Sequence, residues 1–294
     1  MDIYIRNLRY NQELLLSHET KPFILEEDGV DFGEAEGEFS TVDDIQGLGK
    51  NITSSFFKER DISVIAWIVN TNEASVKKSK QFLNRLINPM HEIELVIDEY
   101  KIKVRATNSP KYAKTYRENN AYLCRFVLDF VAYYPFFKLK ADNILKKSEA
   151  AGEMLFPLTI PFGLGKVFGK IPYNNVNQVY NTGDIEVGFE LAVLADEGAI
   201  SYMACKNNTT GEEMTINEGL EKGEKFIIST KTGEKFVKKV DADGNETDVT
   251  NKLTSESSLF MLTPGDNKLD FESDNNYVLK FDLKFSPSFM EVVG

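Results

Sequence analysis

The chain has 294 residues, which is long enough for two domains of ordinary size, and its apolar (42%) and charged (27%) fractions are those of a globular protein. Its net charge of −12 argues against nucleic-acid or anionic-membrane binding as the main role, because neutralising phosphates takes clustered Lys and Arg. No stretch reaches ~18 uninterrupted apolar residues, so no membrane span is expected. Residues 1–10 lack the features of a signal peptide, so synthesis and folding in a cytoplasm are expected.

The first 50 residues predict short strands and long turns, with the acidic run from Glu26 to Glu38 as a solvated loop. After the turn Gly47-Leu48-Gly49, a strand is predicted from Asp61 to Val69. Apolar residues occupy both of its faces: Ile62, Val64, Ala66 and Ile68 on one, and Ile65, Trp67 and Val69 on the other. A strand with one wet face should be polar on that face, so we expect cover on both sides, from a helix and from the core or a neighbouring subunit. Trp67 is expected to be a core residue.

A helix is predicted for residues 73–87. Asn72 and its neighbours supply N-cap residues, apolar positions recur at helical spacing, and Asn88-Pro89 ends the helix. A hairpin follows, with alternating apolar residues in 93–97 and 102–106. The first strand carries acids and the second carries bases on the solvent side, which indicates structural pairing rather than a nucleic-acid site.

The strand predicted for residues 122–134 closes the first half of the chain, and residues 141–153 are polar and weakly patterned, as in a connector. From Met154 onward, short alternating runs are separated by dense turn signals. This pattern is typical of an all-β sandwich. Cys124 and Cys205 each lie in a predicted strand, and buried free thiols are favoured over a disulfide.

Candidate chemistry is sparse. Two cysteines and two scattered histidines form no zinc cluster. The run from Asp241 to Asp248 begins like a calcium loop, but its twelfth position is Lys252 instead of glutamate, so a hairpin turn is favoured. Gly163-Leu164-Gly165-Lys166 lacks the spacing of a phosphate loop. No nucleophile elbow or distinct carboxylate pair stands out. We expect no enzyme activity, no catalytic residue, no cofactor and no metal.

Six segments together resemble the distal tail proteins (Dit) of the siphophage tail protein family, found in phages and prophages of Gram-positive bacteria. The segments, in chain order, are FFKERDISVIAWI (56–68), LNRLINP (83–89), CRFVLDFVAYYPFF (124–137), VYNTGDIEV (179–187), NNTTGEEMTIN (207–217) and SSLFMLTPGDNKLDF (257–271). Their order and spacing carry the resemblance, which spans nearly the whole chain.

The resemblance implies a mainly β fold with one helix. It implies a ring-forming, β-sandwich-like domain over 1–139, a connector over 140–153 and a galectin-like β-sandwich over 154–294. It also implies a structural baseplate hub in the virion tail. This hub is a homohexameric ring, single or in a stacked pair, that joins the tail tube protein to the tail-tip or tail-associated protein and leaves a channel for DNA. No specific nucleic acid and no membrane partner is expected.

Two other function classes stay open on the sequence. One is a carbohydrate-binding module of a tail or cell-surface complex, although the single tryptophan, Trp67, lies outside the β-rich second half. The other is a glycan-cleaving enzyme.

Overall fold

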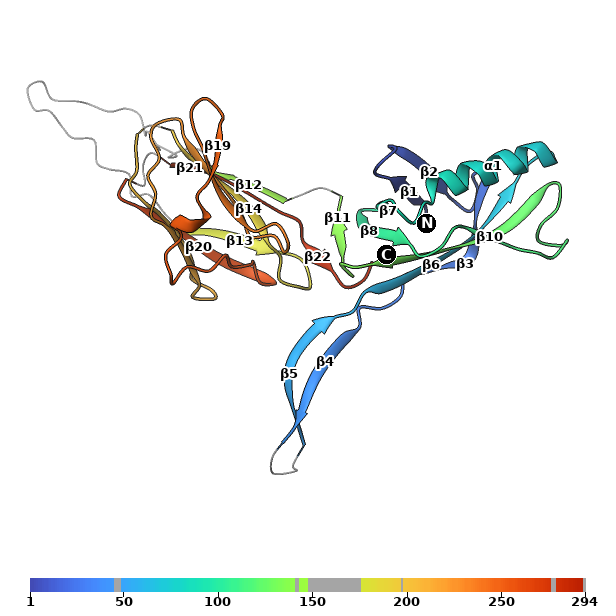
Figure 1. Ribbon diagram of the computed structural model, residues 1–294, viewed down its shortest axis with the longest axis horizontal. Helices are drawn as coiled ribbons and strands as arrows, with labels where there is room; N and C mark the ends of the chain where they lie inside the picture. Colours follow the sequence, from blue (N-terminus) through green and yellow to red (C-terminus); the bar gives the residue numbers. More distant parts are fainter. Residues whose placement is uncertain (45–48, 141–142, 148–175, 197, 276–278, 293–294) are drawn as a thin grey trace, which may run out of the picture. The chain divides into compact units, whose positions relative to one another are not determined.

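The computed structural model describes residues 1–44, 49–140, 143–147, 176–196, 198–275 and 279–292. The chain divides into two compact units, Met1–Ala141 with Ser288–Gly294, and Asp142–Pro287. The described parts are mostly strands, with one α-helix and one short 3₁₀ helix, Thr250–Lys252 (Figure 1). The predicted mainly β fold with one helix is therefore confirmed.

The first unit is built on a ten-stranded sheet whose main path runs β2-β1-β7-β8-β10-β6-β3. Two shorter connections extend it, since β9 pairs with β10, and β11 pairs with both β8 and β22. The strands are β1 (Ile3–Asn7), β2 (Gln12–Leu16), β3 (Phe23–Asp31), β6 (Arg60–Val69), β7 (Ile93–Ile97), β8 (Tyr100–Ala106), β9 (Lys111–Tyr112), β10 (Leu123–Ala132), β11 (Phe137–Leu139) and β22 (Ser288–Phe289).

Helix α1 (Glu73–Leu86) covers one face of this sheet. Its N-cap is Asn72, whose side-chain Oδ1 accepts a hydrogen bond from the Ser75 backbone N–H at 2.9 Å, which satisfies a free donor of the first turn. The helix residues Val76, Leu83 and Leu86 are buried in one cluster with the inward side chains of β6. The predicted helix is confirmed to within one residue.

The two faces of β6 differ, contrary to the expectation that both are covered. Its even-numbered side chains from Ile62 to Ile68 are buried in the core, whereas Ile65, Trp67 and Val69 are only half-buried and lie outside the core cluster. The helix and the core lie on the same side of the strand, so neither covers the second face. Trp67 is consequently a residue of the outer sheet face and not of the core.

The acidic run predicted as a solvated loop is largely strand. β3 extends to Asp31, and its pairing with β6 jumps from Leu25↔Ala66 to Val30↔Val64 across a bulge. Gly29 is required in this bulge, because a Cβ there would lie 2.5 Å from the Ile65 carbonyl oxygen. The acids of the run other than Glu26 are exposed, so its solvation is confirmed, whereas the loop assignment is wrong for residues 26–31 because they belong to the strand that pairs with β6.

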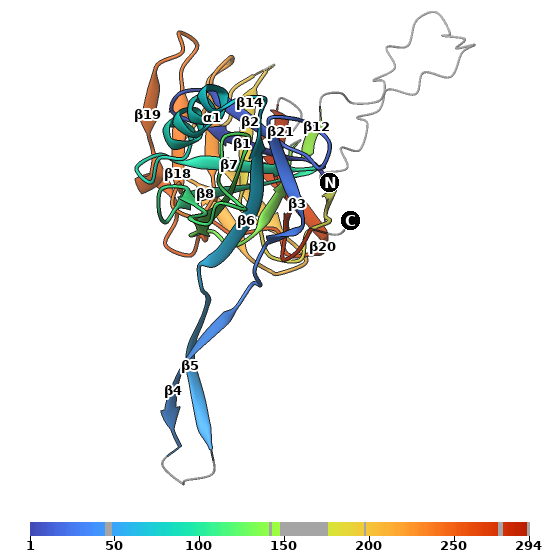
Figure 2. The same ribbon diagram turned by 90° about the vertical axis from the view of Figure 1, so that its right-hand side faces the viewer.

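A two-stranded ribbon projects from the first unit (Figure 2). It consists of β4 (Gly37–Asp43) and β5 (Lys50–Phe57), which pair with each other and with no other described strand. We call residues 37–57 the arm. The turn Gly47-Leu48-Gly49 lies mostly outside the described residues.

The chain returns to the first unit at its C-terminal end. β22 pairs with β11 through Phe137↔Phe289 and Lys138↔Ser288. The sequence placed all of 154–294 in the second domain, but Ser288 and the described residues after it belong to the first unit. A two-residue strand whose partner lies about 150 positions earlier has no local pattern from which this pairing could be predicted.

The second unit holds two sheets, ordered β12-β21-β14-β17-β18-β19 and β13-β20-β15-β16. Buried residues of both sheets form one core cluster, as in a sandwich. The strands are β12 (Asn143–Lys147), β13 (Val176–Asn181), β14 (Phe189–Ala195), β15 (Met203–Asn207), β16 (Glu213–Ile216), β17 (Lys225–Ser229), β18 (Phe236–Val240), β19 (Glu246–Asp248), β20 (Gly265–Ser273) and β21 (Leu279–Phe285). Part of the predicted connector is thus strand β12, paired with β21, and residues 148–153 lie outside the described residues.

The cysteines confirm the prediction of buried free thiols, since Cys124 and Cys205 are both buried and unpaired with each other. Helix α1 has too few residues and too many polar ones to cross a membrane, and it is the only α-helix in the described ranges.

Candidate functional site

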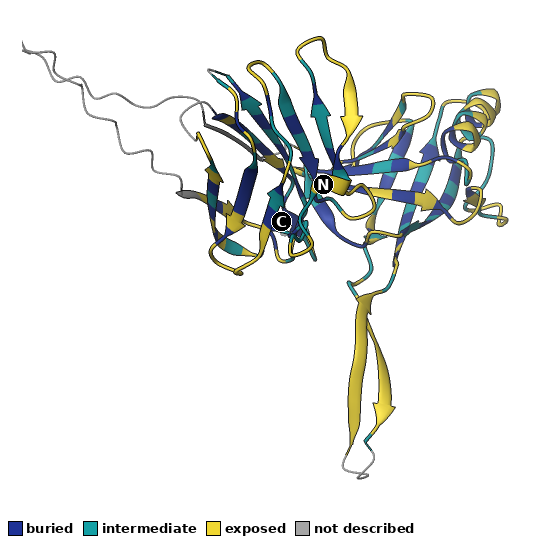
Figure 3. Cartoon of the chain, turned by 60° about the vertical axis from the view of Figure 1, so that its left-hand side comes forward, coloured by how far each residue is buried: buried dark blue, intermediate teal, exposed yellow. Residues whose placement is uncertain are grey.

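The arm is exposed to solvent along its length (Figure 3), and several of its exposed residues are large and apolar. Every residue of β4 and β5 is exposed, and Ile52, at 63%, is as open as any of the apolar ones. The exposed apolar residues are Phe39, Val42, Ile52, Phe56 and Phe57. Such residues are expensive to leave in water when they are contiguous, so an exposed apolar ribbon marks an interaction surface.

Both faces of the arm carry apolar groups. The strand register places Thr41 opposite Ile52 and Glu38 opposite Phe56, with a bulge between Ser40 and Thr41. Directly opposed residues share a face, so Phe39, Ile52 and Phe57 lie on one face, and Val42 and Phe56 lie on the other. Neither face matches the polar surface of a ribbon that stays in water.

The base of the arm is anchored by a row of aromatic rings. Phe57 stands edge-to-face against Phe136, with ring centroids 4.8 Å apart, and Phe136 contacts Tyr134 at 5.1 Å. The Tyr134 hydroxyl lies 3.3 Å from the Ser288 Oγ of β22. Each of these ring contacts contributes about 0.5–1.5 kcal/mol beyond area burial. The arm therefore leaves the body from a fixed base.

Arg60, at the start of β6, ties this base to the C-terminal segment. Its side chain is 1% exposed, its Nη2–H donates to the Met290 carbonyl, and its guanidinium carbon lies 4.9 Å from the centroid of the Phe137 ring. Burial lowers the Arg60 pKa, an effect opposed by the nearby Glu291 carboxylate. A buried cation that loses its hydrogen-bond acceptor is strongly destabilising, so a stable arm base requires the Met290 carbonyl to stay in place.

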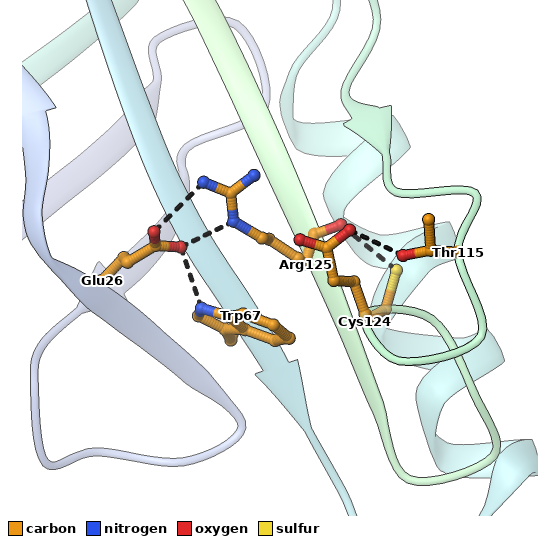
Figure 4. Close-up of polar contacts among 6 residues, drawn as sticks. Glu26, Trp67, Thr115, Cys124 and Arg125 are labelled. Carbon is orange, nitrogen blue, oxygen red and sulfur yellow. Dashed lines mark hydrogen bonds and ion pairs between the residues drawn. The ribbon is translucent and has the colours of Figure 1, made fainter.

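The outer face of the sheet carries a polar cluster around Trp67 (Figure 4). The Glu26 carboxylate on β3 accepts hydrogen bonds from Trp67 Nε1 on β6 at 2.9 Å and from Arg125 Nε on β10 at 2.7 Å. Three adjacent strands are joined by one carboxylate. The Arg125 guanidinium lowers the Glu26 pKa by hydrogen bonding and by its charge, partly offset by burial, and the Trp67 hydrogen bond lowers it further.

Half-buried apolar residues surround this cluster on the same face. Register places Ile24 opposite Trp67 on one side, Val127 opposite Ile65 on the other, and Leu123 opposite Val69. All of them are intermediate in exposure and outside the core cluster of the first unit. The outer face therefore offers a second partly apolar surface, of the mixed polar and aromatic composition typical of interfaces.

The residues considered for chemistry belong to different parts of the chain. Trp67 lies in the first unit, Asp241 lies in the second, and Gly163 to Lys166 are outside the described residues. The Asp241 Oδ1 accepts from the backbone N–H groups of Asp243 and Asn245, at 3.0 and 2.8 Å, in the turn between β18 and β19. The predicted hairpin turn is confirmed there. Among the described residues no group of His, Cys, Asp or Glu is arranged to hold a metal.

Sequence reasoning missed the arm residues. The signal was present in Phe39, Val42 and Ile52, apolar residues set within a polar and acidic stretch. They have no helical or clean alternating period that would place them in a core, and only the pairing of β4 with β5 shows that they occupy both faces of a free ribbon.

Comparison with known proteins relates the second half of the chain to a family, and the whole chain to a known fold. Residues 182–289 match the family model of the siphovirus-type tail component, C-terminal domain. The fold is similar to that of the Dit protein (gp 19.1) of phage SPP1, described as a paradigm of the hub adsorption apparatus in phages infecting Gram-positive bacteria. The TM-score is 0.67 at 13% identity, over 98% of this chain and 99% of that chain.

Weaker likenesses relate the chain to the phage P2 baseplate in its activated conformation. The calcium form gives a TM-score of 0.49 at 9% identity over 97% of both chains, and the strontium form gives 0.47 at 9% identity over 96% and 97%. A search of curated protein sequences gave no match. The family model and the SPP1 fold confirm the resemblance to distal tail proteins drawn from the sequence.

Proposed function

We propose that this distal tail protein, whose residues 182–289 belong to the siphovirus-type tail component family, is the structural hub of a phage or prophage-derived tail baseplate. In this role, six copies form a ring that joins the tail tube to the tail-tip or tail-associated protein and leaves a channel for DNA. The protein acts by assembly and not by catalysis. Its place is the virion tail, after synthesis in the cytoplasm of the host bacterium.

The observation that carries this proposal is the arm. A two-stranded ribbon alone in water is marginal, and this one presents five large exposed apolar side chains on two faces. An interface that covers it removes apolar surface from water at roughly 25 cal/mol per Å². A partner protein is therefore the expected cover.

The difference between the two surfaces is compatible with a ring. The arm and the outer sheet face of one copy differ in shape and chemistry, so contact between an arm and the sheet face of the next copy is heterologous when that copy passes its own arm on to a third. Heterologous contacts close into a ring when the rotation per subunit allows it. The fold is like that of the SPP1 Dit protein, which is described as a hub, and this likeness supports a hub role.

Sedimentation velocity and light scattering of the purified chain test the proposal. Six copies of a 33.3 kDa chain give a species of about 200 kDa, and two stacked rings give about twice that mass. Negative-stain microscopy should show rings with a central hole. A chain that stays monomeric at tens of micromolar, and in the presence of its tail tube protein, would refute the hub proposal.

A further inference from the structure

We propose that the arm of one copy docks across the outer sheet face of a second copy, with the acidic side chains of the arm and of the residues that lead into it against a row of cations on β8 and β11. The inference rests on the proposed ring and identifies the two surfaces that form the contact between neighbouring copies in it. We call Lys101, Lys103, Arg105 and Lys138 the basic row.

The basic row is a concentration of positive charge in a chain of net charge −12. Lys101, Lys103 and Arg105 alternate along β8 with the buried Ile102, Val104 and Ala106, so all three point outward. Lys138 of β11 lies directly opposite Lys101 in antiparallel register. Directly opposed residues share a face, so four cations line one stretch of the outer surface.

This arrangement costs free energy in the isolated chain. Like charges directly opposite each other destabilise a strand pair by up to about 1 kcal/mol. The acids expected to neutralise the row do so only in part. Lys103 lies directly opposite Glu94 and 3.5 Å from Glu92, whereas the Lys101 Nζ donates to the Lys140 carbonyl, and Arg105 has no carboxylate within 4 Å in the described parts of the chain. An acidic partner would relieve the repulsion.

The arm and its approach supply acidic groups. Residues 33–58 contain five acids and two bases, and the two bases lie near Asp43 and Glu36, at 4.0 and 3.4 Å. Glu34 and Glu38 are exposed and make no ion pair within the described residues. The opposite signs of arm and row give electrostatic complementarity, which sets the orientation and rate of an encounter.

The geometry excludes the arm's own sheet as the docking surface. The arm projects away from the sheet of its own unit (Figures 1 and 2), so the receiving face must be on another copy. Seven residues of extended strand span about 24 Å, enough to cross about five strands spaced ~4.8 Å apart. Register places Val131 of β10 opposite Arg105, and Arg125, which faces Trp67, lies six residues further along β10, about 20 Å away. One arm therefore reaches from the Arg105 end of the basic row to the surroundings of Trp67.

Charge reversal on both surfaces tests the contact. Lys101→Glu with Arg105→Glu, and separately Glu34→Lys with Glu38→Lys, should each weaken self-association at least about ten-fold, measured by sedimentation velocity. The variant carrying all four reversals should regain most of the lost association. Lys206→Glu with Lys222→Glu, two exposed lysines of the second unit, is the matched control and should leave association unchanged. Circular dichroism and thermal unfolding confirm that each variant folds.

The outcomes separate this inference from the ring proposal. A wild-type chain that forms rings, while neither double reversal affects them, overturns the docking inference and leaves the ring intact. Rings lost in both double variants and not regained in the combined variant also overturn it, because both surfaces then act independently. If labelled duplex DNA binds the wild type and loses affinity only in Lys101→Glu with Arg105→Glu, the row is a nucleic-acid site and the inference fails. A wild type that never assembles overturns both proposals.

Discussion

Glu26 and Arg125 form a two-point ion pair across β6, with Arg125 Nε and Nη2 at 2.7 and 3.1 Å from the two carboxylate oxygens. The pair spans 99 positions in sequence and clamps the edge strand β3 to β10 over the intervening strand. Trp67 lies between them and donates its indole N–H to the same carboxylate. The cluster fixes the outer face on which the proposed contact depends.

Replacing Glu26 tests the strength of this clamp. Glu26→Gln removes the charge that Arg125 faces, and because both side chains are about a third exposed, the expected loss is about 1 kcal/mol of unfolding free energy at pH 7. Urea denaturation provides the measurement. Glu27→Gln, at an exposed neighbouring position, is the control and should cost less than half as much.

The clamp should also depend on pH. The Glu26 pKa lies below its ordinary value of 4.5 in the native state, so near and below that pH the unfolded chain binds the proton more readily. The stabilisation is complete above about pH 4.5 and is lost as pH falls through the native pKa. The stability difference between wild type and Glu26→Gln should therefore shrink between pH 7 and pH 4. A difference that grows as the pH falls would contradict this.

Trp67 reports on the outer face, since it is the single tryptophan of the chain. It is half-buried in the isolated subunit, and cover by a second copy should shift its emission to shorter wavelength and reduce quenching by acrylamide. Both changes should follow subunit concentration through the assembly transition. Emission that does not change while the ring forms would show that this face stays open to water.

Removing the arm should abolish assembly without unfolding the first unit. Gly37 and Phe57 are directly paired, so residues 38–56 are replaceable by an Asn-Gly turn that rejoins the two strands. The excised residues lie outside the core cluster, so thermal unfolding should shift by only a few degrees. Sedimentation velocity should show a monomer. A ring formed by this variant would place the interface elsewhere.

The C-terminal segment should stabilise the arm base. Ending the chain after Pro287 removes β22 and the Met290 carbonyl that accepts from Arg60, leaving a buried cation without that partner, at an expected cost of about 3–5 kcal/mol. The same truncation combined with Arg60→Leu should cost less than the sum of the two single changes, because the unpaired charge is then absent. Chemical denaturation of the wild type, the truncated chain, Arg60→Leu and the combined variant gives the unfolding free energies of a double-mutant cycle. Strict additivity would mean that Arg60 and Met290 act independently.

Local pattern was sufficient for the elements that pack by a regular period. The helix after Asn72, the strand through Ile62 and Ile68, and the turn at Asp241 follow from residue spacing, because burial on one face and capping are decided by near neighbours. The two buried thiols follow for the same reason.

Long-range pairing decided the rest. The sequence by itself determined a mainly β chain with one helix, and the order of its motifs determined the family resemblance. It could not show that the second face of β6 stays half-open, that Glu26 binds Arg125, or that Ser288 and Phe289 rejoin the first unit. Nor could it show that Phe39 and Ile52 stand on a free arm. These features depend on partners far away in the chain, and the residues that make such contacts show no periodic pattern in the sequence from which the contacts could be predicted.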